Sequence, residues 1–271
     1  MPETRPAPVT VPAVRATKRR DGRPPLVMVT AYDTPGARIA DAAGVDLILV
    51  GDSVANTVLG HPDTLRVTVV EMAHHVAAVA RACPVALVVG DLPWLSYHLD
   101  PVDTVRNAAT LIRAGAQCVK LEGGAVRAPM VAALVEAEIP VMGHVGLTPQ
   151  SIHAMGGHRV QGRDAEAAQG IVESAEILVA AGCFALVVEG VPEKVGALLT
   201  DAVDVPTIGI GAGPACDGQV LVLHDLLGIT PTTPKFVRRY AELGRAATEA
   251  VSAFAADVRS GAFPTDAESY H

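Results

Sequence analysis

The chain lacks any apolar run long enough to cross a bilayer, which takes roughly 18–20 residues. Its longest apolar runs, such as Val85–Val89, are as short as a single strand. The opening MPETRPAPVT lacks the basic-then-apolar order of a secretory signal. No lysine follows a glycine-rich turn at P-loop spacing, which argues against a nucleoside triphosphate as ligand. These absences argue against membrane-spanning and P-loop proteins and favour a soluble globular protein.

Cysteine and positive charge are also scarce. The four cysteines lie far apart and form no CxxC pair, which is typical of reduced, buried thiols in a cytoplasmic protein. The net charge is −8 and the basic residues are scattered, apart from the short run Lys18–Arg20. This balance argues against a nucleic-acid surface. We therefore expect a cytoplasmic protein that binds small molecules, without nucleic-acid or membrane partners.

Eight short apolar segments recur along the chain at intervals that leave room for a helix between them. They are near-continuous runs of Val, Leu and Ile, the pattern of strands that are covered on both faces of a sheet. The predicted strands are Leu26–Ala31, Asp46–Val50, Val85–Val89, Gln117–Leu121, Ile139–Gly143, Phe184–Val188, Val205–Ile210 and Val220–His224.

The intervening segments have helical spacing of apolar residues, clearest in Val69–Ala82, Val102–Ala114 and Ala165–Ala181. An Ala-Gly pair precedes three of the strands, and each glycine can end a helix in the left-handed conformation. Eight strands with helical crossovers predict an α/β protein, a closed (β/α)8 TIM barrel. The competing architecture is an open doubly wound sheet. Its dinucleotide fingerprint should follow the first strand, where this chain reads AYDTPG instead.

We expect a single domain over residues 1–271, with a segment at each end outside the barrel. Residues 1–9 are predicted to be a loose tail. Residues 10–22 should form a helix capped by Thr10 that closes the bottom of the barrel. Apolar residues at helical spacing predict a C-terminal helix over 234–260.

Polar residues follow five consecutive predicted strands, at the barrel end where the chemistry of this fold takes place. A carboxylate beside an apolar strand is costly to desolvate unless it is paired, and several at one rim call for a cation. Hard oxygen ligands favour magnesium over zinc. Any one of these acids could instead be a helix N-cap or part of a loop turn. The candidate site residues are Asp52, Ser53, Asp91, Lys120, Glu122, His144 and Glu189.

From about Thr10 onward the sequence resembles the ketopantoate hydroxymethyltransferase family. The resemblance rests on several motifs in order. One segment departs from the family: in the loop after the second strand, His61–Arg66 reads HPDTLR where relatives more often have HDSTLP. The resemblance therefore leaves open whether this loop contacts folate. The motifs are Val29–Asp33, Val50–Ser53, Asp91–Pro93, Val119–Gly124, Gly143–Ser151, Gly209–Gly213 and His224–Asp225.

The resemblance implies a TIM barrel of the phosphoenolpyruvate/pyruvate-binding type, a Mg²⁺ ion and a homodecamer. It implies that Asp52, Asp91 and Glu122 form the metal site, where Asp52 and Asp91 also meet the substrate. Ser53 and Lys120 should bind the substrate carboxylate. Glu189 matches the catalytic base. His144 matches a site position that we assign to substrate binding.

The implied reaction transfers a hydroxymethyl group from 5,10-methylenetetrahydrofolate to 3-methyl-2-oxobutanoate, giving 2-dehydropantoate for pantothenate biosynthesis. A 2-oxo acid can chelate magnesium, which favours loss of the C3 proton and formation of an enolate. The enolate then attacks the methylene carbon of the folate, and water completes the release of tetrahydrofolate and 2-dehydropantoate.

Three alternatives remain open from the residues. Lys120 could form a Schiff base, as in aldolases that need no metal. The chain could be another magnesium-dependent 2-oxo-acid barrel, a lyase or mutase, although those relatives typically carry a Lys-Cys-Gly-His segment that is missing here. It could also be a non-catalytic scaffold, but such a scaffold has no reason to keep five costly polar groups at one rim.

Overall fold

Eight parallel strands close into a barrel, in which neighbours pair in chain order and β1 pairs with β8. The computed structural model describes residues 7–18, 23–82 and 84–271. The predicted (β/α)8 architecture is confirmed. The strands are β1 (Leu26–Thr30), β2 (Leu47–Val50), β3 (Leu87–Asp91), β4 (Cys118–Glu122), β5 (Val141–Gly146), β6 (Ala185–Glu189), β7 (Thr207–Ile210) and β8 (Gly218–Val222).

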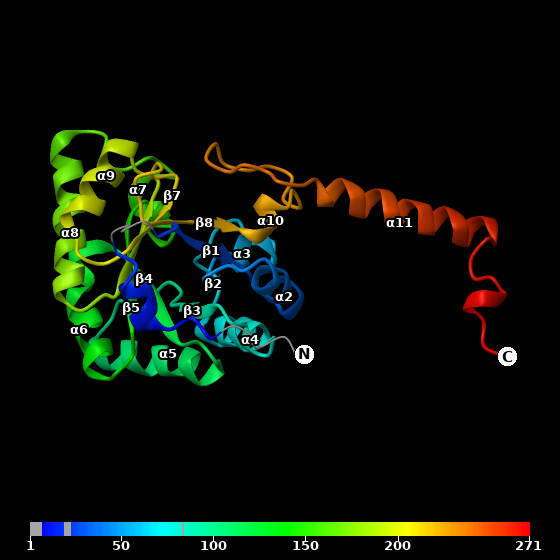
Figure 1. Ribbon diagram of the computed structural model, residues 1–271, viewed down its shortest axis with the longest axis horizontal. Coiled ribbons are helices and arrows are strands. Elements are labelled where there is room, and N and C mark those ends of the chain that lie inside the picture. The colour runs from blue at the N-terminus through cyan, green and yellow to red at the C-terminus, as the bar shows by residue number, and fades with distance from the viewer. Residues whose placement is uncertain (1–6, 19–22, 83) are drawn as a thin grey trace. The chain divides into compact units, whose positions relative to one another are not determined.

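Helices α4, α5, α6 and α8 pack against the outside of the strands (Figure 1). The α-helices are α1 (Val11–Arg15), α2 (Thr34–Ala42), α3 (Val54–Thr57), α4 (Val69–Ala80), α5 (Pro101–Ala114), α6 (Ala128–Glu136), α7 (Ile152–Met155), α8 (Ala165–Ala180), α9 (Glu193–Ala202), α10 (Leu223–Leu226) and α11 (Leu243–Ser260). Three 3-10 segments are η1 (Gly124–Arg127), η2 (Pro149–Ser151) and η3 (Asp266–Glu268).

Glycine ends the helices at the three predicted Ala-Gly turns. Gly44, Gly115 and Gly182 have φ angles of 75°, 116° and 111°. At Gly115 an added Cβ would also lie 2.5 Å from the Cβ of Ala80, so this turn excludes a side chain on two grounds. These turns return the chain from each helix into the next parallel strand.

The third strand begins two residues later than predicted. The backbone N–H groups of Val85 and Ala86 donate to Oδ1 of Asp41, at 2.6 and 3.2 Å, and the described strand pairing begins only at Leu87. The apolar run of the sequence did not reveal this capping carboxylate. β3 also ends later than predicted, with Asp91, which pairs with Lys120 of β4.

The N-terminal segment covers the end of the barrel at which the strands begin. Thr10 caps α1 by accepting a hydrogen bond from Ala13 N at 3.3 Å. Val14 is buried among side chains near the strand starts, and Val9 and Val11 pack against the same cluster. Because Val9 N also donates to Val85 O at 2.8 Å, the predicted loose tail does not extend to Val9. Residues 1–6 of that tail and 19–22 of the predicted helix lie outside the described residues; α1 itself ends at Arg15.

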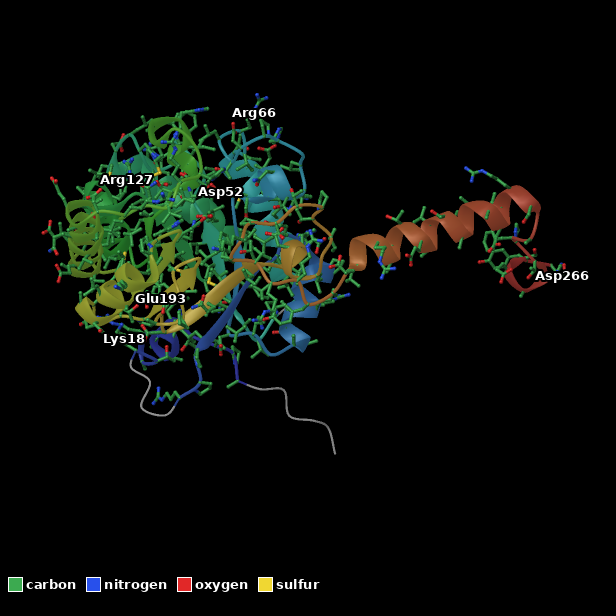
Figure 2. All side chains as sticks on the ribbon, turned by 90° about the horizontal axis from the view of Figure 1, so that it is seen from above. Lys18, Asp52, Arg66, Arg127, Glu193 and Asp266 are labelled. Atoms are coloured by element: carbon green, nitrogen blue, oxygen red, sulfur yellow. The ribbon has the colours of Figure 1, made fainter. Side chains whose placement is uncertain are left out.

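A buried ion pair fastens this segment to the barrel. Lys18 Nζ donates to Asp217 Oδ2 at 2.9 Å and to Thr200 O at 2.6 Å. The same Asp217 oxygen accepts from the backbone N–H of Thr207 at 2.9 Å. In Figure 2, Lys18 lies at the barrel end closed by α1, away from Asp52.

By its internal contacts the chain divides into two units, one ending at Val222 and the other from Leu223 to His271. In the second unit the C-terminal helix begins at Leu243, so the predicted start at 234 is wrong. The N–H groups of Tyr240, Leu243 and Gly244 donate to the carbonyls of residues 226, 227 and 228. These long-range bonds replace the helical bonds that the apolar spacing had predicted. Among the described residues, no helix is both long and apolar enough to cross a membrane.

Candidate active site

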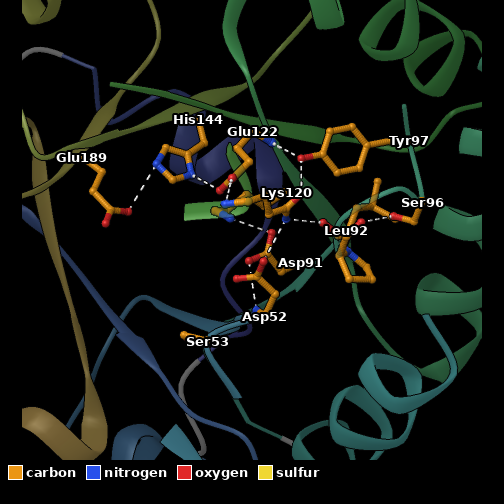
Figure 3. A network of polar contacts seen from close by, with 12 residues as sticks. Asp52, Ser53, Asp91, Leu92, Ser96, Tyr97, Lys120, Glu122, His144 and Glu189 are labelled. Atoms are coloured by element: carbon orange, nitrogen blue, oxygen red, sulfur yellow. Dashed lines mark hydrogen bonds and ion pairs between the residues drawn. The ribbon is translucent and has the colours of Figure 1, made fainter. Parts of the chain in front are cut away.

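Polar side chains from four neighbouring strand ends meet at one rim of the barrel (Figure 3). Asp52 follows β2, Asp91 ends β3, Lys120 and Glu122 lie on β4, and His144 lies on β5. The parallel register places Asp91 beside Lys120 and Glu122 beside His144. All five are at least 95% buried, so every charge here depends on its neighbours for compensation.

Lys120 and Asp91 form a buried ion pair. Lys120 Nζ donates to Asp91 Oδ1 at 2.6 Å, and the backbone N–H of Asp52 donates to Asp91 Oδ2 at 3.2 Å. Burial opposes the charge of Lys120, but the nearby carboxylates of Asp91, Glu122 and Asp52 outweigh it and raise the pKa of the ammonium. Burial raises the pKa of the Asp91 carboxyl, against the opposing effect of Lys120. Lys120 is therefore a cation that pairs with anions and is not a neutral amine.

Asp52 is the carboxylate with the greatest need for a further cation. Burial, followed by the charges of Asp91 and Glu122, raises its pKa well above the ordinary value. Its Oδ2 accepts a hydrogen bond from Gln150 Nε2 at 2.9 Å, which compensates only in part. A divalent cation beside Asp52 would reverse this penalty.

His144 lies between two carboxylates. Its Nδ1 is 3.3 Å from Glu122 Oε2, and its Nε2 is 3.3 Å from Glu189 Oε2. Burial disfavours the imidazolium, but Glu122 and Glu189 outweigh it and raise the pKa of His144 to about 9. Both pairs lie at ion-pair distance, although their angles fall short of hydrogen-bond geometry. Both ring nitrogens thus face protein carboxylates, and His144 links the end of β4 to the end of β6.

Ser53 lies directly after Asp52, where the chain enters α3. Its hydroxyl is 2.8 Å from the hydroxyl of Tyr32, a fully buried residue just after β1. The structure thus brings all seven predicted residues to the strand ends β2–β6, with Ser53 held through Tyr32 and not through the carboxylates.

Two buried polar residues of this network were missing from the predicted set. Tyr97 lies in the loop between β3 and α5, and Gln150 lies in η2 after β5. The Tyr97 hydroxyl donates to Gln150 Oε1 at 2.6 Å. The sequence held one signal for them, the position of Gln150 in the polar run that follows strand 5. Whether such residues reach the site depends on loop conformation, which apolar spacing does not reveal.

The carboxylates of this rim offer a partial donor set for a magnesium ion. Among the residues that the structure describes, no three His, Cys, Asp or Glu side chains form a ready-made metal cluster. Magnesium is usually held by one or two carboxylates, with water and substrate supplying the other oxygens. Asp52 and Asp91 fit this pattern, since they are adjacent hard oxygen donors whose two charges face a single lysine. Glu122 is held instead by Gln150 N, at 2.6 Å, and by His144.

Known proteins match this chain over most of its length. A family model described as ketopantoate hydroxymethyltransferase matches residues 8–266. A 3-methyl-2-oxobutanoate hydroxymethyltransferase of Methylobacterium sp. (strain 4-46) is 56% identical over 262 residues, covering 96% of this chain and 90% of the relative. One of Ignicoccus hospitalis is 55% identical over 239 residues, covering 88% and 91%.

Among solved structures, 2,3-dimethylmalate lyase, a member of the PEP mutase/isocitrate lyase superfamily, superposes with a TM-score of 0.63 at 17% identity. The alignment covers 98% of this chain and 93% of that one. Phosphoenolpyruvate phosphomutase of Streptomyces platensis subsp. rosaceus gives a TM-score of 0.61 at 17% identity, covering 93% and 88%. At this identity the likeness establishes the barrel type alone.

Proposed function

The chain belongs to the ketopantoate hydroxymethyltransferase family and is a hydroxymethyltransferase of pantothenate biosynthesis, and on this premise we propose how its strand ends perform the transfer. The acceptor is 3-methyl-2-oxobutanoate, the one-carbon donor is 5,10-methylenetetrahydrofolate, and the cofactor is Mg²⁺. The observation that carries the proposal is that β4 joins two sets of contacts at one rim: its Lys120 pairs with Asp91, and its Glu122 lies against His144, which also faces Glu189.

Lys120 and Ser53 bind the carboxylate of the 2-oxo acid in this proposal. Lys120 supplies a permanent cation, because its pKa is raised by three neighbouring carboxylates. The same effect argues against the Schiff-base alternative, which needs a neutral amine. Ser53 supplies a hydroxyl that Tyr32 holds in place at 2.8 Å.

Glu189 is the proposed base that removes the C3 proton of the acceptor. Its side chain is 17% exposed, which makes it the most accessible carboxylate of the rim. His144 is proposed as a positioning residue for Glu189, in place of the predicted direct contact with substrate. Removal of the C3 proton leaves an enolate, whose C3 attacks the methylene carbon of the folate as one carbon–nitrogen bond breaks and that nitrogen takes up a proton. Water then replaces the second folate nitrogen on this carbon, which gives the hydroxymethyl group of 2-dehydropantoate and releases tetrahydrofolate.

Asp52 and Asp91 are the proposed magnesium ligands, with the charge of Glu122 nearby. When bound, the ion would supply positive charge beside the keto oxygen of the acceptor, where negative charge develops as the proton leaves. The protein's own contribution is the buried setting, which keeps these carboxylates in place and excludes water.

The proposed assembly is a homo-oligomer, the homodecamer that the family resemblance implies. Support comes from α11, an 18-residue helix in which no residue is buried. Val251, Phe254 and Val258 recur at helical spacing and are 67%, 54% and 48% exposed. A helix with such an apolar stripe normally packs against another surface.

A cytoplasmic location completes the proposal. Cys118 and Cys183 are buried free thiols, and burial raises the pKa of Cys183 to about 12. Such thiols serve as packing groups in a reducing compartment and are poor nucleophiles.

A product assay tests the proposed reaction. Purified protein is incubated with 3-methyl-2-oxobutanoate and 5,10-methylenetetrahydrofolate, with Mg²⁺ or with a chelator, and 2-dehydropantoate is measured. We expect product only with Mg²⁺, and loss of product in Asp91→Asn. Folded wild-type protein that forms product equally well in chelator would refute the metal assignment.

A further inference from the structure

Gln150 lies at the junction of the proposed site, and the mechanism so far gives it no role. It is 4% exposed and comes from the loop after β5. Its side chain and backbone contact three other segments of the rim: the turn after β2, the loop after β3 and the end of β4. Gln150 hydrogen-bonds to both Asp52 and Glu122.

The hydrogen bonds fix the orientation of the Gln150 amide. Its Nε2 lies 2.9 Å from Asp52 Oδ2 and 3.0 Å from the carbonyl oxygen of Leu92. A carbonyl can only accept, so this end of the amide must be the NH2 group. The other end, Oε1, accepts from the Tyr97 hydroxyl at 2.6 Å. A flipped amide would set its oxygen against the oxygen of Leu92.

Tyr97 is held in turn by the backbone of the proposed site. Its hydroxyl accepts a hydrogen bond from Glu122 N at 3.3 Å and donates to Gln150, so both of its functions are used. The ring is fully buried. The direction of donation therefore runs from Glu122 N–H through Tyr97 and Gln150 to the Asp52 carboxylate.

The backbone of Gln150 holds a second carboxylate. Its N–H donates to Glu122 Oε1 at 2.6 Å. One residue thus fixes one oxygen of Asp52 with its side chain and one oxygen of Glu122 with its main chain. Both carboxylates are at least 95% buried, so each depends on such donors for compensation.

We propose that Gln150, oriented by the Tyr97 hydroxyl, is a positioning residue that holds the Asp52 carboxylate in the arrangement required for metal binding. The inference rests on the proposed role of Asp52 as a magnesium ligand. Residues that orient metal ligands typically change metal affinity or activity by about 10- to 100-fold when they are replaced. Gln150 should therefore set the metal affinity of the protein before any substrate is bound.

The test measures Mn²⁺ binding to the full-length protein without substrate, by electron paramagnetic resonance. Gln150→Met removes the amide, keeps the length of the side chain and leaves the backbone bond to Glu122. Tyr97→Phe removes only the hydroxyl that orients the amide. Ser96→Ala is the matched control, since it removes a buried hydroxyl of the same loop that bonds to Pro93 O.

We expect Gln150→Met to bind Mn²⁺ about 10- to 100-fold more weakly, and Tyr97→Phe to be weakened in the same direction by a smaller factor. Ser96→Ala should bind like wild type. In the product assay, a higher Mn²⁺ concentration should restore much of the rate of Gln150→Met, because the defect lies in metal affinity. A defect of folding would not respond to metal in this way.

Two results would overturn the inference, and they are distinguishable. If wild type binds Mn²⁺ and Gln150→Met binds it equally well, Gln150 does not position Asp52 and the proposed function stands. If wild type forms product but binds no Mn²⁺, the metal role of Asp52 is wrong and the inference fails with it. Should Gln150→Met not fold, Tyr97→Phe decides: Mn²⁺ affinity equal to that of Ser96→Ala refutes the proposal.

Discussion

Replacing Lys120 with methionine separates the charge of this residue from its packing. Methionine fills similar space but carries no charge. Asp91 then loses its 2.6 Å ion pair and keeps only the 3.2 Å hydrogen bond from Asp52 N. Removing one partner of a buried ion pair typically costs about 3–5 kcal/mol of unfolding free energy. The cost has a ceiling, because Asp91 can take up a proton. For a carboxyl with an ordinary pKa of 3.8, protonation at pH 7 costs about 4 kcal/mol.

We therefore expect Lys120→Met to lose about 3–4 kcal/mol at pH 7. The loss should shrink as the pH falls. Without Lys120, burial raises the folded-state pKa of Asp91 further above its unfolded value, so the folded variant binds more protons than the unfolded chain. Its stability then rises as pH decreases, by up to about 1.4 kcal/mol per pH unit. Wild type gains less, because Lys120 opposes the rise.

The assay is urea unfolding at pH 7.0 and pH 5.5, at one fixed protein concentration. Lys194→Met, at an exposed position of α9, is the control for the substitution itself and should change stability little at either pH. The reasoning would be refuted by a loss below about 1 kcal/mol at pH 7. A loss of equal size at both pH values would also refute it, since that result would indicate packing and not charge.

Three further changes test other parts of the site. Glu189→Gln should lower kcat about 10²- to 10⁴-fold with little change in KM, in steady-state kinetics; a kcat near that of wild type would contradict its role as the base. Tyr32→Phe removes the hydroxyl 2.8 Å from Ser53 and should raise KM for the 2-oxo acid about 2- to 12-fold; a change confined to kcat would contradict a binding role for Ser53. Burial, followed by the charge of Arg127, lowers the pKa of His98 to about 4 in the folded protein. As the pH falls below about 6.5, the unfolded chain therefore binds a proton at this histidine before the folded protein does, and the folded protein loses stability. His98→Asn should therefore lose less stability than wild type between pH 7.0 and pH 4.5 in urea unfolding; equal losses would contradict this.

The barrel was predictable because its local signals agree with one another. Continuous apolar strands and left-handed glycines at 44, 115 and 182 point to the same parallel topology. The acids of the rim were predictable for a related reason: each lies next to a strand, and the carboxyl ends of parallel strands meet at one rim.

The errors arose where contacts distant in sequence decide the backbone. Residues 234–242 have helical apolar spacing, yet the amides of Tyr240, Leu243 and Gly244 bond to the carbonyls of residues 226, 227 and 228. Tyr97 and Gln150 reach the site through the conformations of two loops, which no periodic pattern describes. His144 was placed at the site, but only the distances to Glu122 and Glu189 indicate what it contacts.

The most direct test of the account is exchange of the C3 proton of 3-methyl-2-oxobutanoate in deuterated water, followed by NMR without folate. This measurement isolates proton removal from the transfer of the one-carbon unit. We predict that wild type with Mg²⁺ exchanges the proton and that Glu189→Gln does so at least about 100-fold more slowly. Exchange in Glu189→Gln at the wild-type rate would contradict the central claim, that the strand ends of this barrel place Glu189 as the base.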